Sequence, residues 1–380
     1  MVTSKSKRVF SSIVLLALIA TTLTLANPTV VIKLYKSIYV KYVRIAKSDF
    51  EKRFTDQQLQ DAITQANAQP WVQEQIAADL APYQNGISHA QINSWFSELQ
   101  HNSGNKLVKF TVTNGTVTVI AAPELIESRA YKTVHSVISL LVNKKLIPDC
   151  EFIVALNDYL AFVPEGRTAP AAILSFAKHT QLPVEQHTIL IPDWMNVRYW
   201  DVLRSRIDLA NRVFPWDRKK DLIHWRGGRA DSMQHRTRLL SLTKTVDFLD
   251  VGMTEGANPA SYMDPEFSVQ YKYQIALDGA RCTWERMVWQ MYSNTVLIKP
   301  SSPQVQWFHR GLTPYVNYIP LADVTESEVT TAYNWLQDND ESAKIIMRNA
   351  NKFARENFKT QDFFAYYAVL LNEYAKLISP

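Results

Sequence analysis

Short apolar runs alternate with helix-like stretches from about residue 150 onward, and this alternation constrains the fold more than any other feature. The runs Phe152–Leu156, Leu222–Trp225, Lys272–Leu277 and Thr295–Lys299 have the length and composition of buried strands. Helix-like stretches such as Trp200–Val213 separate them. Strands that alternate with helices form parallel sheets covered by helices on both faces. The pattern therefore predicts an α/β protein.

The alternation falls into two sets that meet near residue 200, which predicts two Rossmann-like domains facing a cleft. We place these domains at residues 51–198 and 199–380, after a separate segment at residues 1–50. Within the first domain, residues 107–120 alternate apolar and polar side chains around Asn114-Gly115. That dipeptide between two alternating runs is typical of a hairpin closed by a type I′ turn.

Positive charge is concentrated at the amino terminus. The net charge of the chain is +5, but residues 1–50 hold eight Lys or Arg and a single acid, a balance of +7. The other 330 residues therefore carry −2 and lack the basic surface that nucleic-acid binding requires. We expect no nucleic-acid partner.

The first fifty residues have the pattern of a membrane attachment. An apolar run, Ile13–Ala26, follows Lys5, Lys7 and Arg8, and a basic amphipathic stretch comes next. This predicts a single-pass or monotopic membrane protein anchored through residues 1–50. A cleaved signal peptide is the alternative, because the uninterrupted apolar core is short.

An arginine- and glycine-containing turn is the first candidate site. The strand-like run Leu222–Trp225 leads directly into Arg226-Gly227-Gly228-Arg229, and Arg236 follows within a few residues. Glycines let a backbone approach a ligand closely, and arginine offers paired donors to phosphate oxygens. Ligands of parallel sheets bind at the carboxyl ends of the strands. The turn therefore predicts a phosphate site, and an exposed basic turn is the alternative.

A second strand–turn–helix pattern lies further along the chain. The strand Lys272–Leu277 ends in Asp278-Gly279, and we expect a helix over Arg281–Tyr292 that brings Thr283 and Arg286 to the same ligand. The alternative is an ordinary connection in which Thr283 caps the helix.

A third candidate is Asp158, just beyond the strand Phe152–Leu156. A carboxylate at the carboxyl end of a strand, opening into a cleft, can act as a general base. The alternative is a structural loop aspartate. Neither the two cysteines, Cys150 and Cys282, nor the scattered histidines have the spacing of metal ligands, so we predict no metal and no other cofactor.

In chain order, these segments resemble glycosyltransferase family 90. The resemblance is carried by Pro148-Asp149, Asn157-Asp158-Tyr159, Leu174–Lys178, Ile191–Trp194, Phe214–Lys220, Trp225–Arg229, Tyr271–Tyr273, Asp278-Gly279, Thr283 and Tyr318–Pro320. It implies the two-domain architecture called GT-B, a nucleotide-sugar donor bound by the carboxy-terminal half, and catalysis without a metal.

The resemblance also assigns roles. It implies that Asp158 is the base and that Arg226, Gly227, Gly228 and Arg229 contact the donor diphosphate. Arg236 matches a further family arginine after a small gap. Two positions depart from the family pattern: Gly228 replaces a serine, and Glu285 stands where an arginine is expected, one residue before Arg286.

Together these features predict an enzyme that moves a sugar from a UDP-sugar to a hydroxyl of an envelope, lipopolysaccharide or other glycan acceptor. The anchor and the two cysteines favour a lipid-linked acceptor and a bacterial inner-membrane enzyme that faces the cytoplasm. One alternative is a catalytically inactive, membrane-tethered protein that binds nucleotides or carbohydrates. Another is a membrane-anchored phosphoryl transferase, which would need a cluster of metal-binding carboxylates.

Overall fold

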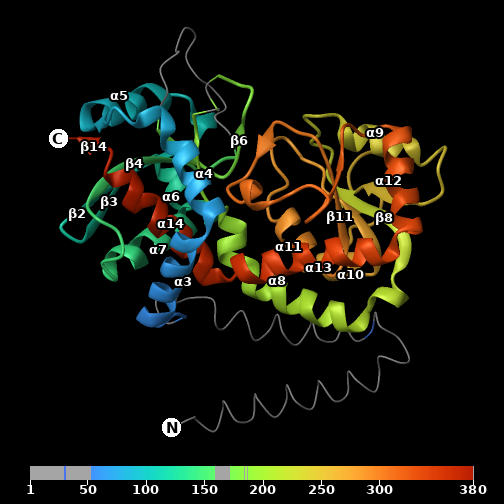
Figure 1. Cartoon of the computed structure of the whole chain (residues 1–380). Coiled ribbons are helices and arrows are strands. Elements are labelled where there is room, and N and C mark those ends of the chain that lie inside the picture. The colour runs from blue at the N-terminus through green and yellow to red at the C-terminus, as the bar shows by residue number, and fades with distance from the viewer. Residues whose placement is uncertain (1–29, 31–52, 159–171, 184, 186, 380) are drawn as a thin grey trace.

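The computed structural model of the chain describes residues 30, 53–158, 172–183, 185 and 187–379 (Figure 1). The predicted anchor at residues 1–50 lies outside the described residues except for Val30. In the described part, the helices are α3 (Asp56–Ala68), α4 (Pro70–Leu80), α5 (His89–Leu99), α6 (Pro123–Ile126), α7 (Arg129–Asn143), α8 (Trp194–Val213), α9 (His235–Leu242), α10 (Pro265–Ser268), α11 (Arg286–Tyr292), α12 (Glu326–Asp338), α13 (Asp340–Asn357) and α14 (Thr360–Ala375).

The strands of the same part are β1 (Ile87–Ser88), β2 (Leu107–Thr113), β3 (Thr116–Ala121), β4 (Cys150–Ala155), β5 (Ile173–Ser175), β6 (Lys178–His179), β7 (Ile189–Leu190), β8 (Lys220–Gly227), β9 (Leu249–Met253), β10 (Tyr271–Ile275), β11 (Val296–Pro300), β12 (Gln304–Val305), β13 (Ile319–Leu321) and β14 (Ile378–Ser379).

The first five-stranded sheet has the order β3-β2-β4-β5-β7. Strands β3 and β2 form the predicted hairpin, and the φ angles of 50° at Asn114 and 74° at Gly115 fit the predicted type I′ turn. Strand β2 also pairs antiparallel with β4, whereas β4, β5 and β7 run parallel. Every residue of β4 is buried, including Glu151, and the run from Phe152 to Ala155 is apolar as expected of a strand covered on both faces.

The second five-stranded sheet is wholly parallel and has the order β13-β11-β10-β8-β9. From β8 the chain first moves to one side, to β9, and then crosses to β10 on the other side. This order places a topological switch point between β8 and β10, where connections leave in opposite directions. Open parallel sheets bind ligands in the crevice outside the carboxyl ends of the strands at such a point.

The carboxy-terminal helix α14 returns to the amino-terminal part of the chain and packs on α3, α4, α7 and α8 (Figure 1). Its apolar side chains belong to a core that begins with Leu59 of α3 and also contains Met287 and Val288 of α11. A second core joins β8, β10 and β11 to α12 and α13. These sheets and layers confirm the predicted α/β class.

No helix in the described part of the chain is long and apolar enough to cross a bilayer. The predicted transmembrane helix therefore has no counterpart there, and the stretch on which it was based is among the residues without a description.

Candidate functional site

A pocket of about 360 Å³ opens at the carboxyl ends of β8 and β10, at the topological switch point of the second sheet. It is lined by the turn after β8, by the loop that joins β10 to α11, and by residues around α10. The sequence-predicted residues that line it are Arg226, Gly227, Gly228, Arg236, Gly279, Thr283 and Arg286. Segments 60 residues apart in the chain therefore meet in one hollow.

The indole of Trp225 packs back against the turn that follows β8, and the turn needs a glycine to allow this. A Cβ on Gly227 would lie only 2.5 Å from Cζ2 of Trp225, closer than any real carbon contact. Trp225 is almost fully buried. Gly227 is thus required by packing at this point of the chain.

Two arginines lie over the Trp225 ring. The guanidinium carbon of Arg236 is 5.1 Å from a ring centroid of Trp225, and that of Arg286 is 5.8 Å away. Arg236 also donates to the Gly228 carbonyl at 2.9 Å and to the Leu277 carbonyl at 3.3 Å. These contacts fix both groups at the pocket wall.

The charges of these two arginines are not neutralised by acids at ion-pair distance among the described residues. Burial, and after it the charge of Arg286, lower the pKa of Arg236 to about 10. Burial also lowers the pKa of Arg286. The two guanidinium groups lie close together although both are withdrawn from water and carry the same charge. An anion placed between them could accept hydrogen bonds from both.

The arginines of the turn itself differ from this pair. Arg226 lines the pocket, but its guanidinium forms an ion pair with Asp250 and donates to the Asp250 carbonyl at 2.7 Å. Arg229 is exposed and outside the pocket lining, and its backbone N–H donates to Glu255 at 3.1 Å. Arg229 therefore does not line the pocket.

The loop after β10 also differs from its prediction. Helix α11 begins at Arg286, not at Arg281, because Trp284 takes a left-handed φ of 53° and ends regular structure before it. Thr283 does not cap the helix but donates to Oε1 of Gln306 at 2.8 Å. Asp278 is buried away from the pocket, and that burial raises its pKa to about 6.

Asp158 lies beyond the end of β4, in the first sheet, and does not line the pocket. It is buried, and burial raises the pKa of its carboxyl while the charges of Arg281 and Lys106 act in the opposite direction. Its charge also reaches Cys282, whose thiol pKa is raised by burial first and by Asp158 second. Cys282 lines the pocket, so the charge of Asp158 acts on a residue of the pocket wall.

A salt bridge next to Asp158 joins the two chain segments and was not predicted. Nη2 of Arg281, in the loop after β10, lies 3.1 Å from Oε1 of Glu185, in the segment between β6 and β7. The antiparallel pairing of β6 with β12 reinforces the same junction. Arg281 lies in the segment that the sequence predicted to follow Asp278-Gly279. No motif or periodicity around Glu185 indicated that it would pair with Arg281.

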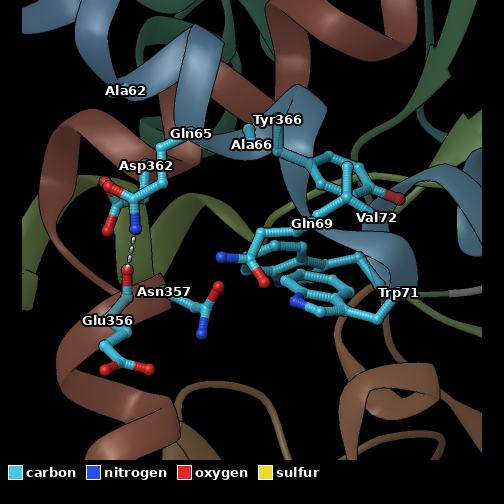
Figure 2. Close-up of a pocket in the computed structure, with 11 residues that line it drawn as sticks. Ala62, Gln65, Ala66, Gln69, Trp71, Val72, Glu356, Asn357, Asp362 and Tyr366 are labelled. Atoms are coloured by element: carbon cyan, nitrogen blue, oxygen red, sulfur yellow. Dashed lines mark hydrogen bonds between the residues drawn. The ribbon is translucent and has the colours of Figure 1, made fainter.

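A smaller hollow lies between α3, α4 and α14 (Figure 2). Trp71 and Tyr366 form its apolar wall, and Gln65 donates to the Glu356 carbonyl at 3.0 Å beside it. Its volume of about 20 Å³ fits one water molecule. None of the predicted residues lines it, so it is a packing feature and not the candidate site.

No three His, Cys, Asp or Glu side chains gather into a metal-binding group within the described ranges. Asp338 and Asp340 lie at the junction of helices α12 and α13.

Comparison with known proteins adds a family to this geometry. The sequence model of glycosyl transferase family 90 matches residues 65–380. Protein O-glucosyltransferase 3 of Homo sapiens is 24% identical over 328 residues, which cover 81% of this chain and 62% of the human protein. The O-glucosyltransferase rumi of Drosophila melanogaster is 22% identical over 364 residues, or 89% of this chain and 83% of that protein. The chain thus spans less than two thirds of the human relative.

These relatives correct one prediction. The prediction of a bacterial inner-membrane enzyme facing the cytoplasm was wrong, because the similar proteins are animal O-glucosyltransferases. That prediction used the charge and hydropathy of the first fifty residues and the small number of cysteines.

Proposed function

This chain belongs to glycosyltransferase family 90, and on that premise we propose that it transfers glucose from UDP-glucose to an acceptor hydroxyl. Family membership confirms the predicted class of enzyme, a glycosyltransferase. The donor is our proposal from the pocket and from the names of the relatives, which are O-glucosyltransferases.

The observation that carries the proposal is the pair Arg236 and Arg286 on Trp225. A nucleoside diphosphate carries adjacent negative phosphates, and two guanidinium groups without acidic partners supply matching donors. The pocket lies at the switch point of the parallel sheet, where a nucleotide binds in folds of this kind. We propose that Gly227, Gly228 and Gly279 let the diphosphate approach the backbone there.

We propose that Asp158 is the general base. It would take the proton of the acceptor hydroxyl as the acceptor oxygen bonds to the anomeric carbon, while the bond from that carbon to the diphosphate oxygen breaks. Arg236 and Arg286 would stabilise the negative charge that develops on the leaving UDP. The raised pKa of Asp158 suits this role, because a more basic carboxylate accepts a proton more readily.

The arrangement of the two sheets supports a GT-B organisation, which we propose with an acceptor side at residues 51–198 and a donor side at residues 199–380. We also propose that the reaction needs no metal, because the arginines would neutralise the leaving group. Activity that survives EDTA would agree with this, and activity that returns only with Mn²⁺ or Mg²⁺ would reject it.

The acceptor hydroxyl belongs to a glycan or to a protein. The sequence predicted a glycan such as lipopolysaccharide, whereas the relatives carry names that state protein as the acceptor. We propose a hydroxyl-bearing acceptor of either chemistry and compare the two directly, with purified glycans and with folded protein domains as parallel acceptors.

The first test is transfer of radiolabelled glucose by the purified chain and by Asp158→Asn. We expect the variant to lose about 10²- to 10⁴-fold in transfer, the range for a general base, while its affinity for UDP stays nearly unchanged. Asp61→Asn, an exposed change on α3, is the matched control. Retained turnover in Asp158→Asn rejects the base, and UDP binding without transfer or hydrolysis by the wild type would identify an inactive binding protein.

A further inference from the structure

One carboxylate, that of Glu285, lines the pocket, although the arginines of the same pocket favour a negatively charged ligand. Glu285 stands directly before Arg286 and borders the same hollow as Arg236, Tyr262 and Met195. A negative charge beside a diphosphate site weakens binding unless it serves another part of the ligand. The position of Glu285 therefore needs its own explanation.

The loop that carries Glu285 is fixed from both sides by one buried side chain. Gln306 accepts from the Thr283 hydroxyl at 2.8 Å and donates to the Trp284 carbonyl at 3.2 Å. Trp284 then turns the chain with its left-handed φ of 53°. Glu285 occupies the cap position of α11, yet its side chain does not cap the helix. The carboxylate therefore lines the pocket without capping α11.

The Glu285 carboxylate accepts a hydrogen bond from its own backbone N–H and lies within reach of the Arg286 charge, and both lower its pKa. No hydrogen bond or ion pair joins it to the side chain of another residue in the described part of the chain. Burial outweighs both effects and raises the pKa of Glu285, whose charge contributes after burial to the raised pKa of Asp193 and of Tyr262. Glu285 is half-buried, and a carboxylate withdrawn from water is costly unless hydrogen-bond donors satisfy it. The neutral donors that a nucleotide sugar brings to such a group are its hydroxyls.

We propose that Glu285 accepts hydrogen bonds from a pair of neighbouring hydroxyls on the sugar nucleotide, which makes it a specificity residue of the donor pocket. This inference rests on the proposed function. The hydroxyls belong to the ribose or to the transferred hexose, and both present two adjacent O–H donors to the two carboxylate oxygens.

The test compares Glu285→Gln with the wild type in UDP binding and in the KM for UDP-glucose. If the carboxylate reads hydroxyls of the hexose, KM rises about tenfold while the affinity for UDP is unchanged. If it reads the ribose, the affinity for UDP falls by a similar factor and the preference for UDP over 2′-deoxy-UDP is lost. Either result supports the proposal.

Simple electrostatics predicts the opposite sign, which makes the test decisive. If Glu285 only repels the diphosphate, removing its charge tightens UDP and UDP-glucose alike, and that result overturns the proposal. Unchanged constants overturn it too. Glu255→Gln is the matched control, because Glu255 lies beside the Arg229 N–H but outside the pocket lining; it should tighten UDP slightly.

A thermal melt of the unliganded protein confirms that Glu285→Gln is folded, since the amide has the same shape as the carboxyl group that it replaces. A wild type that neither binds UDP nor transfers glucose would refute the proposed function itself. Normal wild-type activity with an unaffected Glu285→Gln would refute only this inference.

Discussion

At the scale of single residues, the arginines near β8 divide into those with an acidic partner and those without one. Arg226 is neutralised by Asp250, and Arg229 is exposed. Arg236 and Arg286 both lie against the Trp225 ring, and the charge of Arg286 acts on Arg236. The latter pair therefore carries the expected affinity for a diphosphate.

Replacing Arg286 by alanine should reduce the affinity for UDP by about 10- to 100-fold, the range of a hydrogen bond to a charged group. Affinity for uridine should change little, since uridine has no phosphate. Isothermal titration calorimetry with UDP and with uridine measures both effects.

Arg229→Ala is the control, because it removes an arginine of the same turn that does not line the pocket. An equal loss of UDP affinity in both variants would contradict the assignment of Arg286, and not Arg229, to the diphosphate. A thermal melt of unliganded Arg286→Ala checks that the variant is folded before its affinity for UDP is compared.

At the scale of elements, helix α8 begins at a fully buried cap. Oδ1 of Asp193 accepts from the N–H groups of Met195 and Asn196 at 3.1 and 2.9 Å, as expected of an N-cap aspartate. Burial first, and the charge of Glu285 among the later causes, raise the pKa of Asp193 to about 7. The helix thus starts on a carboxyl group that prefers to be protonated in the folded chain.

This predicts that Asp193→Asn makes stability less dependent on pH. Since the folded pKa is about 7 and the ordinary value is 3.8, Asp193 favours the folded state at low pH, and that contribution is lost as pH rises through 7. Asparagine caps equally well and does not titrate. Between pH 5 and pH 8, the variant should gain about 2–3 kcal/mol over the wild type.

Urea unfolding at the two pH values measures this gain. Asp217→Asn, an exposed change near the other end of α8, should follow the wild type. A gain that is absent, or that appears at low pH instead, would show that Asp193 is ionised at little cost.

At the scale of the whole molecule, the last helix, α14, packs against the first sheet. Side chains of α14 belong to the same core as Leu59 of α3 and Met287 of α11, which lies next to the candidate site. Tyr374 of α14 also donates to the Glu151 carbonyl of β4 at 3.2 Å. The two parts of the chain therefore share a core, and their stability is coupled.

Leu371→Ala should accordingly destabilise the entire molecule by about 2–5 kcal/mol, the usual cost of deleting a buried leucine side chain. The midpoint of thermal unfolding should fall, and it should be the same whether unfolding is followed by far-UV circular dichroism or by the loss of UDP binding. Ile345→Ala, on the exposed face of α13, is the control and should cost little. Two separate transitions in Leu371→Ala would show that the parts unfold independently.

The sequence predicted most strands and the hairpin because each depends on a local pattern. Asn114-Gly115 encodes its turn through φ angles that these two residues accept, and the apolar run of β4 has the composition of a buried strand. The start of α11 was predicted five residues early, because the conformation of Trp284 depends on contacts such as the one from Gln306, 22 residues away.

By itself, therefore, the sequence determined the α/β class, the glycine turn after β8 and the family, since these are written in residue spacing. Only the tertiary structure decided which charges remain available. Asp250 neutralises Arg226 from the neighbouring strand, and the loop after β10 brings Arg286 to Trp225. Ion pairs and burial depend on residues that are distant along the chain. No local sequence pattern therefore distinguishes an arginine with an acidic partner from one whose guanidinium is available to a ligand.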